Sequence, residues 1–459
     1  MKKLRNAMAL SLLVFSINIL SNSAFAENVS ASNQVKDTDL TKTTSQSAEK
    51  PAVNLDLKDQ DNDKNILPVL ELKGGVKEAQ QERPSLLKTW LNGDYATGNW
   101  GGLRGRLEEH GVTLSGSYTN FDFMNMRGGT RTKSDLRYQG LLFTTATFDT
   151  EKMGLWKGGK AVVTYGNNHG NGISRDYIGD WQLINTYDCG RFSQLYEYYY
   201  EQGLLNDKFK IKVGKQDANN DFVALDSAFL FNNGGFFIQN TPITTYPSPG
   251  LGVMTTIQPV SWFALKSGIF DGNAEPKGLG FRTAFNGKEN YTIMNEAAIT
   301  HNYKNYKGKY SVGHWISTSD NSVEGYDQTY ANAYGIYSGF DQMIFKENSD
   351  PNDSQGLNVF GQFGWAPPDK RTVTRYFGGG LVYKGLIPKR NNDVIGIGTN
   401  FARFSGRYDA PHGETVVESF YKFQLTPWLA VQPDFQVVSK PSGLNRNAYA
   451  LGLKTVINF

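Results

Sequence analysis

The chain ends on the stretch YALGLKTVINF, residues 449–459, in which large apolar side chains alternate with small or polar ones. Counting from Tyr449, every second residue up to Phe459 is apolar or a threonine, whereas Lys454 and Asn458 belong to the other set. Successive side chains of a β-strand point to opposite faces, so this stretch predicts a strand with one apolar face. Its length and its aromatic ends are typical of a strand that crosses a membrane.

The two segments before it repeat the pattern, with the residues 426–428 as a short turn between them. The apolar set comprises Leu429, Val431, Phe435 and Val437 in one segment, and Val417, Tyr421, Phe423 and Leu425 in the other. The polar set comprises Gln432, Asp434 and Gln436, with Glu418, Lys422 and Gln424. Three consecutive antiparallel strands are therefore predicted at the C-terminal end.

Alternation of this kind is also found in soluble β-sandwiches, which place their apolar face inward. Three features favour a membrane barrel instead: aromatic residues at strand ends, an export signal without a spanning helix, and a regular body of about 370 residues from Trp90 onward. At about 20–25 residues for each strand with its connection, this body holds roughly 16 strands. We therefore predict an all-β fold, a transmembrane antiparallel β-barrel over residues 90–459.

Residues 1–26 have the composition of an export signal, in which basic residues and an apolar run precede Ala24, Phe25 and Ala26. We expect cleavage after Ala26 and transport to the bacterial outer membrane; an uncleaved membrane anchor is the less favoured alternative, because the apolar run is short. Removal of the signal takes away three of the 47 basic residues and no acidic one, which leaves 44 bases against 44 acids. A neutral chain carries no basic footprint for nucleic acid, so no nucleic-acid partner is expected.

Residues 27–89 form a polar leader that we expect to be mostly disordered, because it contains few large apolar side chains. A short helix is predicted near its end, over residues 85–91, where Pro84 precedes the helical stretch. Three alternate aspartates at 59, 61 and 63 have the spacing of a calcium loop. The glycine and the glutamate that complete such a loop are replaced by Lys64 and Leu70, so a solvated linker is favoured over a metal site.

The sequence offers little that indicates catalysis. It contains no glycine-rich nucleotide motif and no HExxH motif, and its five histidines are not spaced as metal ligands. A single cysteine, Cys189, excludes a disulfide framework. We therefore expect no enzyme activity, no cofactor and no metal. A barrel hydrolase with a Ser–His pair on its wall is the less favoured alternative, since nothing singles out such a pair.

The polar faces of the strands would line the lumen of a barrel. Glu418, Lys422 and Asp434 are then wall residues, which either hydrate the pore or form a charge ladder that orients solute. An earlier hairpin adds Glu197 and Lys212, whose strands place opposite charges across from each other.

The connection over residues 175–191 is the candidate for the narrow region of the pore, and it contributes Arg175, Asp176, Asp188 and Arg191. If it folds inward, facing arginines and carboxylates would provide paired hydrogen-bonding groups for polyhydroxylated solutes. The alternative is an ordinary extracellular loop with surface charges.

Several motifs together resemble the carbohydrate-selective porin family OprB. They are GNWGGLR at 98–104, LEEHGV at 107–112, QLYE at 194–197, KVGKQ at 212–216, GIFDG at 268–272, GGL at 379–381, PKRNND at 388–393 and WLAVQPDFQ at 428–436. The resemblance implies a 16-stranded outer-membrane barrel, a homotrimer, through which small carbohydrates pass by facilitated diffusion. The strand that ends at Phe459 resembles the signal read by the barrel assembly machinery.

The sequence departs from the family pattern in one respect. Sugar porins of the glucose type are expected to combine Arg with Glu at the constriction, whereas residues 166–192 contain Arg and Asp but no Glu. The preferred sugar is therefore left open. The alternatives to a sugar porin are a general diffusion porin without a sugar site, and a structural or adhesive surface barrel.

Overall fold

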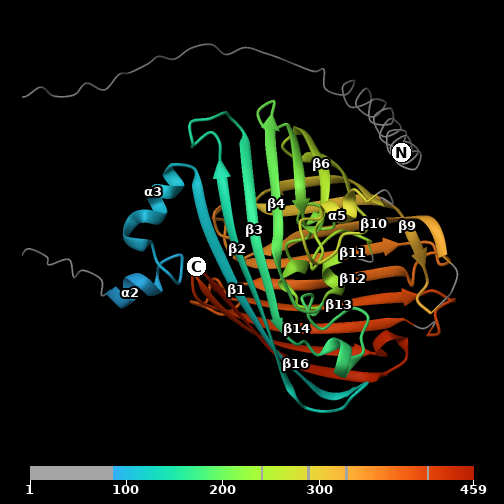
Figure 1. The fold of residues 1–459 in the computed structure, drawn as a ribbon. Coiled ribbons are helices and arrows are strands. Elements are labelled where there is room, and N and C mark those ends of the chain that lie inside the picture. The colour runs from blue at the N-terminus through green and yellow to red at the C-terminus, as the bar shows by residue number, and fades with distance from the viewer. Residues whose placement is uncertain (1–85, 239–240, 287–289, 326–328, 411–412) are drawn as a thin grey trace, which may run out of the picture. The chain divides into compact units, whose positions relative to one another are not determined.

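The computed structural model describes residues 86–459 apart from 239–240, 287–289, 326–328 and 411–412. The predicted signal and most of the predicted leader lie outside the described residues. The described chain forms one closed barrel of sixteen antiparallel strands, as the sequence predicted (Figure 1). The strands are β1 (Val112–Gly129), β2 (Leu136–Asp149), β3 (Gly159–Gly170), β4 (Phe192–Leu204), β5 (Phe209–Gln216), β6 (Gly250–Val260), β7 (Phe263–Asp271), β8 (Tyr291–Tyr303), β9 (Tyr306–Ser322), β10 (Thr329–Lys346), β11 (Gly356–Trp365), β12 (Val373–Lys384), β13 (Val394–Phe404), β14 (Glu414–Thr426), β15 (Leu429–Ser439) and β16 (Arg446–Asn458).

The barrel closes where β1 pairs with β16, a pairing in which Phe121 stands opposite Lys454. The last residue completes this seam, because the backbone groups of Phe459 and Gly116 exchange two hydrogen bonds of 2.7 and 2.9 Å. Closure leaves no strand edge unpaired, which is what a β-structure needs in a hydrocarbon environment.

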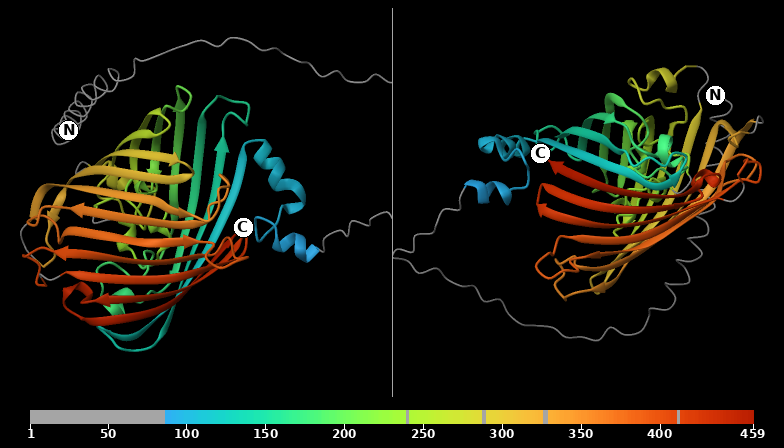
Figure 2. Two further views of the ribbon diagram at one scale, coloured as in Figure 1. Left: turned by 180° about the vertical axis from the view of Figure 1, so that it is seen from behind. Right: turned by 90° about the horizontal axis from the view of Figure 1, so that it is seen from below.

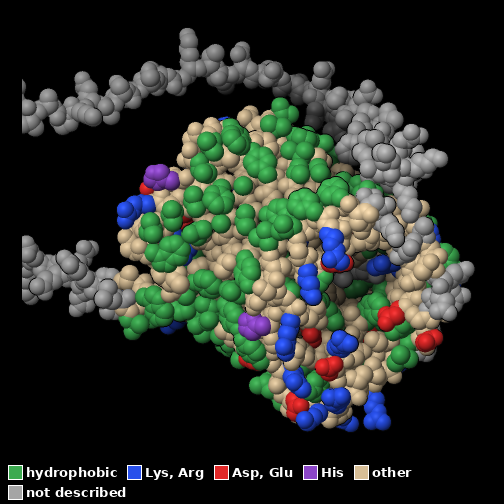
Figure 3. All heavy atoms as spheres, viewed as in Figure 1, with side chains coloured by type: hydrophobic (Ala, Val, Ile, Leu, Met, Phe, Trp, Pro, Cys, Tyr) green, Lys and Arg blue, Asp and Glu red, His purple; other side chains and the backbone are tan. Residues whose placement is uncertain are grey.

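The strand faces follow the predicted alternation. On β14 the side chains of Val417 and Phe423 point outward and are about 40% exposed, whereas Glu418 between them is fully buried inside. Leu451 and Leu453 of β16 are exposed in the same way. Figure 3 shows hydrophobic side chains spread over the strand wall that faces the viewer, with most visible charges on the side away from the N-terminal helices. Among the described residues, the structure contains no helix long and apolar enough to span a membrane.

The two ends of the barrel differ in their connections. The end here called the turn end has several connections of two to four residues, such as 261–262 and 427–428, and it also carries the C-terminus. The opposite end, the loop end, carries the long connections 171–191, 217–249 and 272–290. In outer-membrane barrels the short turns face the periplasm and the long loops face the outside.

Two short helices precede β1 at the turn end: α2 (Leu86–Leu91), where the sequence predicted a helix, and α3 (Leu103–Glu109), with the single turn η1 (Trp100–Gly102) before it. Both views of Figure 2 show α2 and α3 beside the C-terminus. The backbone N–H of Ala96 donates to the carbonyl of Asn458 at 2.9 Å, and the rings of Trp90 and Trp428 lie 4.7 Å apart.

Two of the long connections fold into the barrel, where they appear in green in Figure 1. We call them the β3–β4 loop (residues 171–191) and the β5–β6 segment (residues 217–249). The first contains η2 (Ser174–Ile178); the second contains η3 (Ala218–Asn220), η4 (Ala228–Leu230) and α4 (Gly235–Ile238). Two further short helices, α5 (Phe281–Ala284) and η5 (Pro441–Gly443), lie in other connections at the loop end.

Apolar side chains of both connections pack on inward-facing apolar side chains of the wall. Ile178 and Ile184 of the β3–β4 loop belong to one cluster with Phe121 and Val416. The β5–β6 segment packs in two further clusters. One contains Phe222 with Phe270, Met294, Trp315 and Tyr337; the other contains Phe231 and Phe236 with Phe360, Val382 and Phe420. A fully buried side chain of this size contributes about 1.5–3 kcal/mol to folding. The barrel therefore has a hydrophobic core inside its lumen, which the alternation pattern did not predict.

Candidate solute pathway through the barrel

The wall residue Glu418 holds the β5–β6 segment inside the barrel. Its carboxylate accepts hydrogen bonds from the backbone N–H groups of Asn232, at 2.6 Å, and of Asn233, at 2.9 Å. Asp434 on the neighbouring strand accepts one from the side-chain amide of Asn232 at 2.8 Å. The sequence placed Glu418 and Asp434 on the lumen wall, and the structure shows that the segment covers both of them.

The same arrangement recurs around the barrel. In each case an inward-facing carboxylate of a strand accepts hydrogen bonds from backbone N–H groups of an inward-folded connection. We call these five residues the wall carboxylates: Glu197, Glu296, Asp341, Glu414 and Glu418. Their respective donors are the backbone N–H groups of Asp217, of Val223, of Ser227, of Trp181 and Gln182, and of Asn232 and Asn233. The distances lie between 2.6 and 3.0 Å. Hydrogen bonds to a charged group contribute about 1.5–3 kcal/mol each, so these contacts fix the position of both connections.

Three of these residues, Glu296, Asp341 and Glu414, were not among the residues that sequence reasoning selected. A signal for the covered lumen was nevertheless present in the sequence. Val416 and Phe420 lie on the same inward face of β14 as Glu418, and both are almost completely buried. Apolar side chains on the face that should meet water indicate that protein, rather than water, lies against it.

The charged residues of the β3–β4 loop do not lie together. Arg175 and Asp176 are exposed on η2. Asp188 turns back within its own loop and accepts a hydrogen bond from the N–H of Ser174 at 2.8 Å. Arg191 is exposed and donates to the carbonyl of Gly170 at 2.8 Å. Within the described part of the chain no ion pair joins these four residues.

The predicted hairpin pair has the expected register, with Glu201 of β4 opposite Lys212 of β5. The ammonium group of Lys212, however, forms an ion pair with Asp221 of the β5–β6 segment and lies 4.7 Å from the centre of the Tyr199 ring. Glu197 and Lys212 therefore both contact this segment. Lys422 points inward near the turn end and is half-buried.

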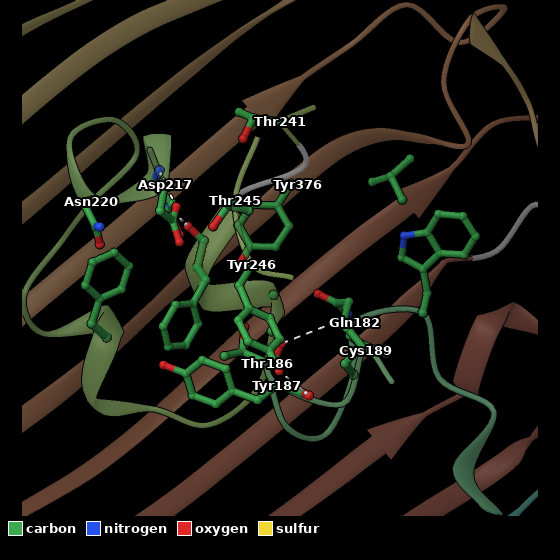
Figure 4. A pocket seen from close by; sticks show the side chains of 18 of the residues that line it. Gln182, Thr186, Tyr187, Cys189, Asp217, Asn220, Thr241, Thr245, Tyr246 and Tyr376 are labelled. Atoms are coloured by element: carbon green, nitrogen blue, oxygen red, sulfur yellow. Dashed lines mark hydrogen bonds between the residues drawn. The ribbon is translucent and has the colours of Figure 1, made fainter. Parts of the chain in front are cut away.

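A cavity of about 750 Å³ lies between the two connections and the wall, a volume within the usual range for small-molecule sites. Figure 4 shows Gln182, Thr186 and Tyr187 of the β3–β4 loop beside Thr245 and Tyr246 of the β5–β6 segment. The lining combines aromatic faces with amide and hydroxyl groups. Its aromatic members are Phe143, Trp181, Tyr187, Tyr196, Phe229, Phe237, Tyr246 and Tyr376.

Tyr246 lies at the centre of an aromatic cluster in this cavity. Its ring packs edge-on against Tyr187, with the ring centres 4.8 Å apart, and it also contacts Phe192 and Tyr196. Its hydroxyl accepts a hydrogen bond from the side-chain amide of Asn168 at 2.6 Å. Aromatic faces flanked by fixed polar groups suit the apolar faces and the hydroxyl edges of sugar rings.

Buried titratable groups of the two connections hold their protons more tightly than usual. Burial raises the pKa of Tyr187 to about 12, so its phenol stays neutral. Burial also raises the pKa of Asp217, and burial together with the charge of Glu414 raises the pKa of Asp180 well above its ordinary value. The buried acids of the connections therefore bond to donors of the protein and resist ionisation, and they do not serve as charged groups for a solute.

Comparison with known proteins agrees with this architecture. Porin B of Pseudomonas aeruginosa is 23% identical over 79% of this chain and 91% of its own length. The proposed porin QuiX of Acinetobacter baylyi is 26% identical over 81% of this chain and 93% of its own length. The structure of Pseudomonas putida OprB at high pH superposes with a TM-score of 0.73 at 22% identity, covering 80% of this chain and 99% of that one, which shows the shared fold.

The family model described as "Carbohydrate-selective porin, OprB family" matches residues 133–459, most of the described barrel. This match confirms the resemblance drawn from the sequence motifs, and with the closed barrel it indicates a protein of the bacterial outer membrane. The chain belongs to the OprB family of carbohydrate-selective porins.

Proposed function

We propose that this porin passes mono- or small oligosaccharides by facilitated diffusion along the cavity between the β3–β4 loop and the β5–β6 segment. One observation carries the proposal: this cavity of about 750 Å³ is lined by aromatic rings together with amide and hydroxyl groups. Such groups replace the water around sugar hydroxyls while the ring faces stack, and no covalent step is needed. The site we assign to sugar is therefore centred on Tyr246, Tyr187 and Gln182.

A general diffusion pore is the second candidate within transport. Such a pore needs an open aqueous lumen, whereas here Phe222, Phe231 and Phe236 fill part of the interior. A narrowed path forces solutes into contact with its wall, which favours selectivity over free diffusion.

Liposome swelling with a series of sugars tests this proposal. Sugar flux through the purified protein should saturate as the sugar concentration rises. Tyr246→Ala removes the central ring, so its flux should saturate only at higher sugar concentrations. The matched control is Tyr383→Ala, because Tyr383 lies near the turn end and bonds Glu347 outside the cavity. Flux that rises linearly with concentration for every sugar would support a general diffusion pore instead.

We also infer that the protein is a channel and not an enzyme, an inference supported by its family. The rival is a barrel hydrolase that cleaves membrane lipid. Incubation of the purified protein with labelled phospholipid should release no fatty acid above the level of a blank; sustained turnover would contradict this inference.

For export and assembly, we infer cleavage after Ala26, contact of the outward apolar face with outer-membrane lipid, and assembly as a homotrimer. The trimer rests on the family alone. Mass spectrometry of the mature protein tests the cleavage, and light scattering in detergent tests the trimer, for which a monomer mass would be the contrary result.

The barrel assembly machinery is the proposed reader of the C-terminal strand. In the structure the ring of Phe459 packs against Gly116 of β1, beside the backbone hydrogen bonds that close the seam, so loss of the ring would affect both recognition and closure. We expect Phe459→Ala to lower the amount of assembled barrel in the outer membrane severalfold, measured by heat-modifiable migration. Phe459→Tyr, which keeps the ring, should assemble normally.

A further inference from the structure

Three lysines lie on one line of the inner wall near the turn end. Lys384 of β12 stands opposite Val394 of β13, which stands opposite Lys422 of β14. On the next pair of strands Gln432 of β15 stands opposite Lys454 of β16. Lys422 lies at the level of Gln432, between the pairs Phe420–Asp434 and Phe423–Val431. Alternate strands are about 10 Å apart, so the lysines follow one another around the wall at that spacing.

The ammonium groups of this lysine row are accessible and largely without protein partners. All three side chains are half-buried, on the face that points into the barrel. Lys384 donates to the hydroxyl of Ser354 at 2.7 Å. For Lys422 and Lys454 the described residues supply neither a hydrogen bond nor an ion pair, although Lys454 lies 5.6 Å from the centre of the Phe121 ring. Lys454 also lines the cavity between the two connections.

The carboxylates nearest to the row are already engaged. Glu418 and Asp434 lie toward the loop end from Lys422 and Lys454, and they are 0% and 2% exposed. The oxygens of Glu418 accept hydrogen bonds from the backbone of Asn232 and Asn233, and those of Asp434 from the side chains of Asn232 and Gln436. These acids lie under the β5–β6 segment, and neither forms an ion pair with a lysine of the row, although their charges act on Lys454.

The opposite wall shows the contrary arrangement. Two of its inward lysines are matched with acids, since Lys212 forms an ion pair with Asp221 and Lys266 lies 3.5 Å from Glu296; Lys210, on the same face of β5 as Lys212, forms no ion pair with a described residue. Lys309 donates to a backbone carbonyl of the β5–β6 segment at 2.6 Å and stands opposite Asp341 in register. Within the described chain, the wall formed by β12, β14 and β16 therefore differs in carrying three lysines at one level without an ion pair.

A further cation lies on the same pathway. Arg371 of the β11–β12 connection lines the cavity, and its guanidinium lies 5.8 Å from the centre of the Trp315 ring. Within the described chain its side chain forms no ion pair. The two acids that line the cavity already accept hydrogen bonds from the protein. Glu197 accepts one from the backbone N–H of Asp217, and Asp217 accepts one from the hydroxyl of Tyr196 at 2.5 Å.

We propose that this porin prefers anionic polyhydroxylated solutes, such as sugar acids that carry one carboxylate, and that the row of Lys384, Lys422 and Lys454 selects them. The proposal rests on the proposed function and names its substrate class. An unmatched row of one charge inside a narrow, low-dielectric lumen raises the local concentration of counter-charged solute. The hydroxyl groups of the same solute remain free for the aromatic and amide groups around Tyr246.

D-glucose and D-glucuronate provide the test, because they share a pyranose ring and differ by one carboxylate. Flux of each is measured into liposomes that contain the full mature protein, at low ionic strength. We expect glucuronate to enter roughly tenfold faster than glucose, and the preference to shrink as salt screens the lysines. The triple variant Lys384→Gln, Lys422→Gln and Lys454→Gln should abolish the preference, measured as the ratio of glucuronate flux to glucose flux in the same preparation.

Three controls separate charge from damage to the fold. Replacement of the same three residues by arginine should retain the preference. Lys152→Gln, which removes an exposed lysine from the β2–β3 turn, should change nothing. The reversal potential in a KCl gradient should shift from anion selectivity toward zero in the glutamine variant, a readout that requires no sugar.

The outcomes distinguish the two proposals. Two results would overturn the proposed role of the lysine row and leave the sugar pathway intact. One is saturable glucose flux without a glucuronate preference, and the other is a preference that survives in the glutamine variant. Failure of both solutes to show saturable flux would overturn the proposed function and this inference with it.

Discussion

Release of the β5–β6 segment from the wall should change the pore more than any substitution on the outer surface. Glu418 accepts hydrogen bonds from Asn232 and Asn233 at 2.6 and 2.9 Å, in a fully buried position. Each such bond contributes about 1.5–3 kcal/mol when the acceptor is charged. Glu418→Ala therefore removes about 3–6 kcal/mol of local attachment and leaves two buried N–H groups without this acceptor.

A loss of 3 kcal/mol raises the equilibrium population of a detached segment by more than a hundredfold, since each 1.4 kcal/mol is a factor of ten. The apolar packing of Phe231 and Phe236 still resists complete release, so we expect frequent local opening near Asn232 rather than an empty barrel. Single-channel recordings should show a larger mean conductance, more open-channel noise and weaker block by sugar.

The matched control is Glu201→Ala. Glu201 is also an inward-facing carboxylate, opposite Lys212, but among the described residues its side chain accepts no hydrogen bond from the β5–β6 segment. Its removal should leave conductance noise unchanged. If Glu418→Ala assembles normally and its conductance, noise and sugar block match those of the wild type, the account of the wall carboxylates is refuted.

Three further predictions concern the connections inside the barrel. Cys189 is the single cysteine, is exposed and lines the cavity, so a bulky maleimide should reduce sugar flux, and Cys189→Ser should be insensitive; full flux after complete labelling would contradict the pathway. Burial and Glu414 raise the pKa of Asp180, so its ionisation costs stability as pH rises above the ordinary carboxyl range. Asp180→Asn should therefore melt higher than the wild type at pH 8 but not at pH 4, and equal melting at both pH values would refute this. A Cβ at Gly398 would lie 2.8 Å from the Phe231 ring, so Gly398→Val should loosen the β5–β6 segment and increase its cleavage by protease; an unchanged digest would argue against the packing.

The barrel itself could be predicted from the sequence because lipid imposes a simple rule on each strand. Every outward side chain meets hydrocarbon, so the apolar set that includes Val417, Phe423, Leu451 and Leu453 recurs with a period of two residues. The strand number followed from the length of the regular body, and the closed barrel confirms both predictions.

The interior could not be predicted in the same way, because its partners are far apart in the sequence. Glu418 and Asn232 are 186 residues apart, and nothing near either residue indicates the other. Glu418 looked like an ordinary polar wall residue. The inward Val416 and Phe420 were nevertheless a sign that protein fills the lumen there.

For the β3–β4 loop, the sequence bore on the course of the backbone but not on the contacts of the charged side chains. The sequence left open whether this connection folds inward or forms an ordinary extracellular loop, and the structure shows Tyr177 and Ile184 buried inside the barrel. Its charged residues did not provide the expected facing pairs. Arg175 and Asp176 are exposed, while Asp188 accepts from the backbone N–H of Ser174 and Arg191 donates to the backbone carbonyl of Gly170. Local hydrogen bonds compete with long-range pairs for such side chains, and only the folded structure shows which contact forms.

The measurement that tests the central claim most directly is the single-channel current of the wild-type protein while glucose is titrated into a planar bilayer chamber. A sugar pathway between the two inward connections predicts that the current falls to a plateau along a saturation curve, and that Tyr246→Ala moves this curve to higher glucose concentrations. A current that falls only in proportion to the viscosity of the solution, with no plateau and no effect of the substitution, would contradict the claim.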